Sequence, residues 1–426
     1  MALNNTPPST NRSAPAAPSF DAFLRATQPL SFPLSSQSAT NFGDSRTFTA
    51  DKTGYCESIL CYVSGTFTSG LLTNNPIFDP SFFPWNIISR ITVQSNNGFQ
   101  FYNTLGFENA MVQQAWFGKS NSPYSRLNPF WALGAASNVL PTTPLLYTDK
   151  GARNFMPTVF NVTDSAVVSP GDTIGASKTY EFSIPYLIPL TAAQDIRAGL
   201  CLIQSQSSGL QIQFTVGTSA DLVAPGAAGN GAVTLTLSAL TITPTQFSFA
   251  VPNDPSAQPY APGQAIRNRW ISERVAWSNT GDIDYRYPVG GTIVKSFHHF
   301  KNIGTVTTSG KLIPQPYFGT ANRPSTPNFG NVKVVYGSTE NPMNIPFNHA
   351  LWQYESQWGT PVPEGVIPFD YGTLSYPDLG INPVGLLNTA GLTEAKTTVN
   401  VAGTVTVTAG SVIDVLRQEL QMSGGA

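Results

Sequence analysis

Apolar and polar residues alternate with a period of two along several segments of the chain. This pattern is typical of a strand with one buried face, because successive side chains of a strand point to opposite sides of a sheet. The apolar sets that would each share one strand face are Ile59, Cys61, Val63 and Phe67; Leu210, Ile212, Phe214 and Val216; Val233, Leu235 and Leu237; and Val399, Val401, Val405 and Val407. We therefore expect strands to dominate the chain.

Two segments have a helical pattern instead. Their apolar stripes, at helical spacing, are Phe107, Met111, Val112, Ala115 and Trp116, ending before Gly118, and Phe347, Leu351, Tyr354 and Trp358, after Pro346 and before Gly359. The first, NAMVQQAWFG (109–118), loosely resembles the second, NHALWQYESQWG (348–359). One helix in each half of the chain suggests a duplicated unit.

The strands, turns and length together predict an all-β protein. The chain has 426 residues, with 36 glycines and 35 prolines for turns and loops. Such strands are typical of sandwiches or barrels, of which the jelly roll is the eight-stranded version, and the length suits two tandem β-domains, each with a short helix inserted. The expected boundaries are an extended Pro- and Ser-rich N-terminal arm (1–45), a first jelly roll (46–252), a proline-rich linker (253–262), and a second jelly roll with a C-terminal tail (263–426).

Charge is scarce. Only 11% of residues are charged, against about 25% in a typical globular domain, and the net charge is −2. A surface with so little charge is poorly protected against association, which favours a protein covered by its neighbours. The first 46 residues contain three arginines and two aspartates, too few cations for an arm that binds nucleic acid directly.

The N-terminal residues do not have the pattern of a secretory signal, so synthesis in a host cytoplasm is expected. The most apolar long window, 130–147, is interrupted by prolines and polar residues and does not predict a membrane span.

Residue types that usually carry chemistry are few. The three cysteines have no CxxC spacing, and Cys56 and Cys61 are expected on one strand, too far apart to bridge. His298 and His299 are expected on opposite faces of a strand, and His349 on the second helix, with no HExxH motif. We therefore expect no catalytic residues, no cofactor and no metal site.

Two other function classes remain open from the residues. Asp282 and Asp284 would share one strand face, as the acid pair of a glycosidase or calcium ligands require, although exposed acids near a turn are commoner. A receptor- or carbohydrate-binding module, such as a spike or lectin-like protein, would use the loops 119–158 or 304–330. Trp131 and Tyr147 could stack on sugars there.

The stretch Tyr180–Val216 resembles the major capsid proteins of tectiviruses, tailless phages with an internal membrane. The resemblance rests on a strand ending in Ile188-Pro189-Leu190, a turn with Asp195 and Ile196, a short strand at 200–203, and the Leu-x-Ile-x-Phe pattern that begins at Leu210. The order of elements also matches across most of 47–420. The glycine after the turn differs in position, since Gly199 comes four residues after Asp195 where the family tends to have three.

The resemblance implies a tectivirus-like double jelly-roll major capsid protein and not an enzyme. Such a protein forms pseudo-hexagonal homotrimers that assemble into an icosahedral shell around an internal membrane, so the expected location is the virion capsid. Its partners would be neighbouring capsid trimers and minor capsid and penton proteins, with no direct nucleic acid and with the N-terminal arm as a candidate for membrane contact. The expected assembly residues, in the arm and the tail, are Phe20, Phe23, Leu24, Ile413, Val415, Leu416 and Leu420.

Overall fold

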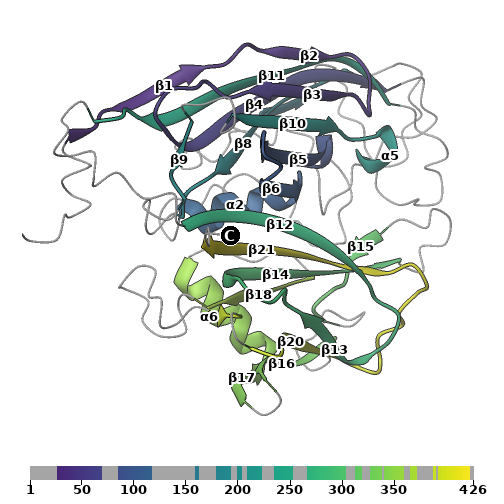
Figure 1. Cartoon of the computed structure of the whole chain (residues 1–426). Coiled ribbons are helices and arrows are strands. Elements are labelled where there is room, and N and C mark those ends of the chain that lie inside the picture. The colour runs from purple at the N-terminus through teal and green to yellow at the C-terminus, as the bar shows by residue number, and fades with distance from the viewer. Residues whose placement is uncertain are drawn as a thin grey trace, which may run out of the picture.

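A computed structural model describes most of the chain (Figure 1). The described residues are 26–69, 85–117, 159–162, 179–192, 199–203, 209–222, 235–252, 266–303, 312–318, 327–337, 340–358, 365–371, 387–389 and 392–422.

Three sheets contain the described strands. The seven-stranded sheet runs in the order β1 (Pro29–Pro33), β11 (Leu235–Phe249), β4 (Tyr55–Ser69), β8 (Thr179–Pro189), β7 (Val159–Val162), with β2 (Gln37–Ala39) beside β11 and β9 (Cys201–Leu202) beside β4. The four-stranded sheet runs β13 (Gly281–Arg286), β20 (Ala395–Val401), β16 (Phe329–Tyr336), β17 (Glu340–Pro346).

A ten-stranded sheet lies between the other two (Figure 1). Its order is β15 (Leu312–Pro314), β14 (Thr292–Ile303), β21 (Val412–Met422), β12 (Ile266–Ala276), β6 (Gln100–Leu105), β5 (Ile88–Ser95), β10 (Leu210–Val216), β3 (Ser45–Thr49), and β18 (Val366–Asp370) and β19 (Leu387–Asn388) pair with β14. The described helices are η1 (Trp85–Ile87), α2 (Glu108–Phe117), α5 (Ser219–Leu222) and α6 (Phe347–Trp358).

The two halves of the chain repeat one topology. In the first half the strands β1, β3, β4, β5, β6, β8, β10 and β11 are divided between two four-stranded layers, ordered β1-β11-β4-β8 and β3-β10-β5-β6. In the second half the corresponding layers are β12-β21-β14-β18 and β13-β20-β16-β17. Helix α2 follows β6 just as α6 follows β17. Both halves are therefore jelly rolls, which confirms the expected all-β double jelly-roll fold and supports the suggested duplication.

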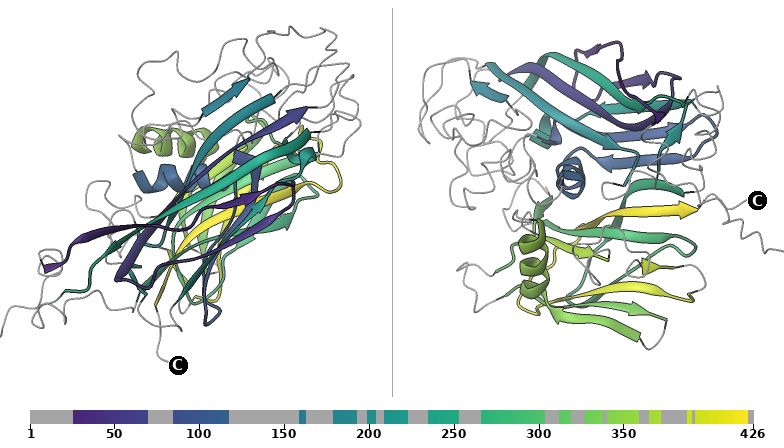
Figure 2. Two further views of the ribbon diagram at one scale, coloured as in Figure 1. Left: turned by 90° about the horizontal axis from the view of Figure 1, so that it is seen from above. Right: turned by 90° about the vertical axis from the view of Figure 1, so that its left-hand side faces the viewer.

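The two rolls share the ten-stranded sheet. They join where β6 of the first roll pairs in parallel with β12 of the second, at Tyr102 with Trp270 and at Asn103 with Ile271. Each roll keeps its own apolar core, although Trp270, Phe297 and Leu416 of the second half pack into the first core. Helices α2 and α6 lie along the same side of the sheets, close to this junction (Figure 2).

The N-terminal arm is shorter than expected. Residues 29–33 form β1, which pairs with β11 as the first strand of the first roll, and β2 pairs with the same strand. The prediction of an arm reaching to residue 45 is therefore wrong for these strands. The Pro- and Ser-rich composition did not exclude strands because β1 lies at the edge of its sheet, where proline is tolerated. The segment 1–25 and the expected linker 253–262 lie outside the described residues.

Prolines mark the edge strand β1 of the seven-stranded sheet and the part of β8 that extends beyond the outer strand β7. On β1, the even-numbered residues face β11, since Leu34 N donates to Pro244 O, so Pro29 and Pro33 face outward. On β8, Leu190 N donates to Glu57 O, so Pro185 and Pro189 likewise face away from β4. Because proline has no N–H, these edges present few donors to another strand.

Helix α2 covers the part of the β8 edge that contains Pro185 and Leu187. The Asn109 side chain forms two hydrogen bonds with the backbone of Leu187, accepting from its N–H at 3.1 Å and donating to its C=O at 2.6 Å. One turn later, Gln113 Nε2 donates to Pro185 O at 2.8 Å and to Asn109 Oδ1 at 2.7 Å. Asn109 and Gln113 are both fully buried. Two amide side chains thus take the place of a neighbouring strand.

Most of the predicted strand faces and both helices are confirmed, but Val405 and Val407 lie in the loop after β20, which ends at Val401, and Val233 lies outside the described residues. Ile59, Cys61 and Val63 are buried on β4, and the alternate residues of β10 are buried as predicted. Cys56 and Cys61 both lie on β4 as free thiols. None of the described helices is long and apolar enough to cross a membrane.

Candidate assembly surfaces and polar clusters

The C-terminal residues expected to clamp other subunits lie inside the fold. Ile413, Val415 and Leu416 are buried on β21, which is hydrogen-bonded to β12 on one side and β14 on the other. Leu420, near the end of the same strand, pairs with Asn268 and Thr292. A central strand has no free edge for another chain, and the buried side chains of Ile413, Val415 and Leu416 are not available to another subunit. An assembly role for the half-buried Leu420 stays a prediction. Phe20, Phe23 and Leu24 lie outside the described residues.

A cluster of charged groups holds β21 to its neighbours. Asp414 accepts from Arg274 of β12 at 2.7 and 3.0 Å and from Lys301 Nζ of β14 at 2.5 Å. Burial alone would raise the pKa of Asp414, but the Lys301 ammonium and the Arg274 guanidinium hold it well below its ordinary value. The carboxylate stays ionised and ties three strands of the shared sheet together.

Glu108 brings this cluster into contact with the first roll. It opens α2, is fully buried, and accepts from Leu105 N and from Ser272 Oγ of β12, both at 2.8 Å. Burial, reinforced by the nearby Asp414 carboxylate, raises the pKa of Glu108 from 4.5 to about 7, although Lys301 opposes the shift. The hydrogen bond to Ser272 links the two rolls directly. Buried ionisable groups of this kind occur in structural networks as well as in active sites.

The three histidines have the positions expected of them. His298 and His299 lie buried on opposite faces of β14: His298 contacts Tyr285 and Phe369 in the second core, whereas His299 contacts Phe107 of α2. Burial lowers the pKa of His298 to about 3, so its ring is neutral among core hydroxyls. His349 is exposed on α6.

No metal site is evident among the described side chains, since no three or more His, Cys, Asp or Glu residues gather there in a suitable group.

The aspartate pair lies on β13, on the outer face of the four-stranded sheet. Asp282 bonds to Asn400 at 2.6 Å and to Lys333 at 3.0 Å, and these contacts lower its pKa. Asp284 accepts hydrogen bonds from Lys396 at 2.7 Å and from Thr398 at 2.6 Å. Burial alone would raise the pKa of Asp284, but these contacts outweigh it and lower the pKa. A glycosidase needs one acid that stays protonated, with a raised pKa. Both carboxyls are ionised and paired, which is the arrangement of surface ion pairs.

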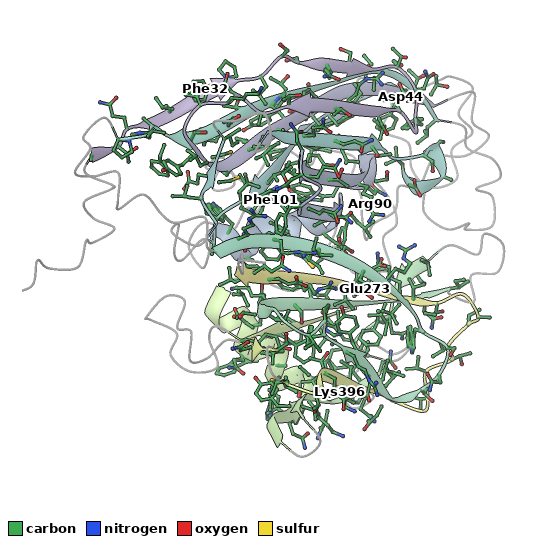
Figure 3. The ribbon with its side chains drawn as sticks, viewed as in Figure 1. Phe32, Asp44, Arg90, Phe101, Glu273 and Lys396 are labelled. Carbon is green, nitrogen blue, oxygen red and sulfur yellow. The ribbon has the colours of Figure 1, made fainter. Side chains whose placement is uncertain are left out.

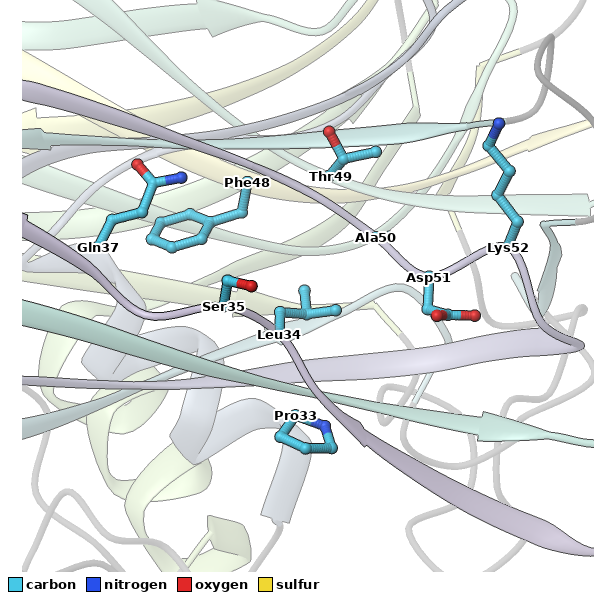
Figure 4. A pocket seen from close by; sticks show the side chains of 9 residues that line it. All are labelled: Pro33, Leu34, Ser35, Gln37, Phe48, Thr49, Ala50, Asp51 and Lys52. Atoms are coloured by element: carbon cyan, nitrogen blue, oxygen red, sulfur yellow. The ribbon is translucent and has the colours of Figure 1, made fainter.

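An open groove of about 600 Å³ lies beside β3, at the edge of the first roll (Figure 4). Phe48 and Ala50 are its buried apolar part, and Gln37 closes one side by donating to Thr47 O at 2.6 Å. Its one carboxylate, Asp51, accepts a hydrogen bond from Thr53. The remaining residues that line the groove are Pro33, Leu34, Ser35, Thr49 and Lys52.

Most of the loops expected of a carbohydrate- or receptor-binding module fall outside the described residues. This is true of 119–158, with Trp131 and Tyr147, and of the larger part of 304–330. Within the second loop, Tyr317 and Phe329 pack on Phe347 of α6 and belong to the second core.

Comparison with known proteins identifies the fold. No protein-family model and no curated protein sequence matches the chain. Among solved structures, it is similar to the STIV MCP, with 10% identity, a TM-score of 0.56, and 93% of this chain and 97% of that chain covered. The capsid protein of the PBCV-1 virus follows at 11% identity, TM-score 0.54, 93% and 95% covered. The Sputnik virophage structure has 12% identity, TM-score 0.50, 94% and 89% covered. The chain therefore has the double jelly-roll fold found in viral major capsid proteins.

Proposed function

We propose that this chain is the major coat protein of an icosahedral virus, with a structural role and no enzymatic one. One observation carries the proposal: two jelly rolls of the same topology, joined through one ten-stranded sheet, match the STIV MCP over 93% of this chain and 97% of the other. Fold alone does not imply function. The scarcity of charge, 11% of residues, independently favours a protein whose surface is covered by its neighbours.

The proposed building unit is a pseudo-hexagonal homotrimer. Three copies of a chain with two similar rolls present six similar corners, so a threefold ring can fill a hexagonal outline under closed symmetry. Neighbouring trimers then form the shell, and minor capsid and penton proteins fill the positions that trimers do not occupy.

The proposed shell encloses an internal membrane, as the resemblance to tectiviruses implies. The segment before β1 remains the candidate for contact with that membrane and with neighbouring trimers, through Phe20, Phe23 and Leu24. It contains too few cations to neutralise a packaged genome.

The test uses the full chain. Sedimentation should give a particle of about three times the chain mass of 45.6 kDa, and electron microscopy should show threefold particles with a hexagonal outline. Deleting residues 1–25 should leave this trimer intact but impair shell formation, because β1 and both cores are retained. A full-length chain that stays monomeric at every concentration would overturn the proposal.

A further inference from the structure

The junction between the two rolls covers one face of the layer β12-β21-β14-β18 in the second roll. Trp270 of β12, Phe297 of β14 and Leu416 of β21 point away from the second core and pack into the first core. All three are at most 2% exposed. A sheet face that would otherwise be open to solvent is therefore buried within the chain.

Helix α2 contributes to this cover from the side of the first roll. Glu108 accepts a hydrogen bond from Ser272 Oγ of β12 at 2.8 Å, and Phe107, just before the helix, packs on His299 of β14 with the ring centroids 5.3 Å apart. The side chains of residues 108–113 are all buried. Helix α2 is thus enclosed between its own roll and the second roll.

The corresponding layer of the first roll, β1-β11-β4-β8, is open on the same face. Tyr62 of β4 and Phe247 of β11 point away from the first core, because the residues on either side of each are buried. Both are only half-buried, and Thr243, which pairs with Tyr62, is exposed. An aromatic and hydroxyl-bearing surface therefore stays open here, where the second roll has a covered one.

Helix α6 is the counterpart of α2, and it too has an open face. Asn348, His349 and Trp352 lie on one side of the helix, at spacings of three and four residues, and all are exposed. Trp352 is 72% exposed. Figure 2 shows α6 and α2 along the same side of the sheets. Tryptophan is among the residues that contribute most to protein interfaces.

A ring of three chains brings these two open surfaces together. In such a ring the second roll of each chain has the first roll of the next chain as its neighbour. Because the six rolls are similar, the contact between chains repeats the contact within a chain. Helix α6 then takes the place of α2, and the layer β1-β11-β4-β8 takes the place of β12-β21-β14-β18.

We propose that α6, through the exposed face that contains Trp352, binds the outer face of the layer β1-β11-β4-β8, around Tyr62 and Thr243, in the next chain of the ring. The inference rests on the proposed coat function and describes the contact that closes its homotrimer. Within the chain, β6 and β12 also pair. The corresponding edge strand β1 has Pro29 and Pro33, so the contact between chains depends on side chains instead.

The other layer of each roll provides control positions. On β3-β10-β5-β6, Arg90 and Gln213 are exposed, so the outer face of this layer is not covered by the second roll (Figure 3). Its counterpart in the second roll is β13-β20-β16-β17, whose outer face includes the exposed Asn331. By the same correspondence, this face should stay open in the ring.

The experiment places charges on the two proposed surfaces. Trp352→Lys and Thr243→Glu each change all three contacts of a ring, and each should raise the dissociation constant of the trimer at least about tenfold. A chain with both substitutions should form trimers more tightly than the two separate effects combined predict, because the introduced lysine and glutamate then meet in every contact. Asn331→Lys and Gln213→Glu are the matched controls and should form trimers like the unmodified chain.

Sedimentation over a dilution series gives the constants, and circular dichroism verifies that each variant is folded. Hydroxyl-radical footprinting of the unmodified chain gives a second measure. Trp352 and Tyr62 should be oxidised more slowly in the trimer than in the monomer obtained by dilution, because both side chains become covered.

The outcomes separate this contact from the coat function. If either variant forms trimers like its control, or if the double variant shows no compensation, α6 does not meet this sheet, and the inference is overturned while the homotrimer stands. Equal oxidation of Trp352 in trimer and monomer would also overturn it. If the unmodified chain forms no trimer, the coat function itself fails.

Discussion

Asn109 is the residue whose replacement tests how the first roll protects its sheet edge. Its side chain is fully buried and bonds both backbone groups of Leu187, in addition to contacts with Tyr102 OH at 2.6 Å and Gln113. Asn109→Ala removes these partners and leaves space for at most a poorly bonded water. The N–H and C=O of Leu187 would then be buried without their partners, because the residue is only 4% exposed.

The expected cost follows from those two groups. A buried donor or acceptor that loses its partner costs about 1 to 3 kcal/mol, so Asn109→Ala should lower the free energy of unfolding by about 2 to 6 kcal/mol. That is a large part of a typical stability of about 5 to 15 kcal/mol. Asn348→Ala is the matched control, since Asn348 has the corresponding place in the related α6 sequence but is exposed. It should change stability by less than about 0.5 kcal/mol.

Urea unfolding, followed by tryptophan fluorescence, measures both variants. Hydrogen exchange of the peptide covering 179–192 should show faster exchange near Leu187 in Asn109→Ala and no change in Asn348→Ala. A loss below about 1 kcal/mol for Asn109→Ala, or a loss equal to that of the control, would refute the assignment of α2 as the cover of this edge.

Three further outcomes are expected. Folding raises the pKa of Glu108 from 4.5 to about 7, so the folded state binds the carboxyl proton more tightly than the unfolded state does. The contribution of Glu108 to stability therefore falls as the pH rises from about 4.5 to about 7. Glu108→Gln should therefore gain stability relative to the unmodified chain between pH 5 and pH 8, and parallel pH profiles in urea unfolding would contradict this. Lys295→Met removes the ammonium that pairs with the buried Asp370 carboxylate and should cost about 3 to 5 kcal/mol, whereas replacing both partners with apolar residues should cost less, as a double-mutant cycle measures. Asp282→Asn should shift unfolding by less than about 1 kcal/mol, because its ion pair with Lys333 is exposed; a larger shift would show a structural role for that pair.

Alternation in the sequence could predict the strands with one buried face and one exposed face. Ile212 and Phe214 on β10 follow that pattern, so the strand was found. It could not predict β21, because both faces of this strand are covered: Val415 packs in the second core and Leu416 in the first. With no polar alternation, the segment looked like a free tail. The edge strand β1 was missed because Pro29 and Pro33 give its segment a composition typical of an extended arm.

The polar clusters could not be predicted, because the residues that pair in them are far apart in the sequence. Glu108 and Ser272 are 164 residues apart, and Arg274 and Asp414 are 140 apart. The histidines and aspartates were placed correctly on their strands because those placements use only local periodicity. Their partners, such as Lys396 beside Asp284, come from the strand order of the four-stranded sheet, which composition alone does not determine.

The prolines on β1, and on the part of β8 beyond β7, have a consequence for how copies can associate. A chain with long strands and little charge would otherwise be a template for fibrils. Pro29, Pro33, Pro185 and Pro189 deny an incoming strand the donors it needs for such growth. In the proposed coat, copies would therefore associate through surfaces other than these strand edges.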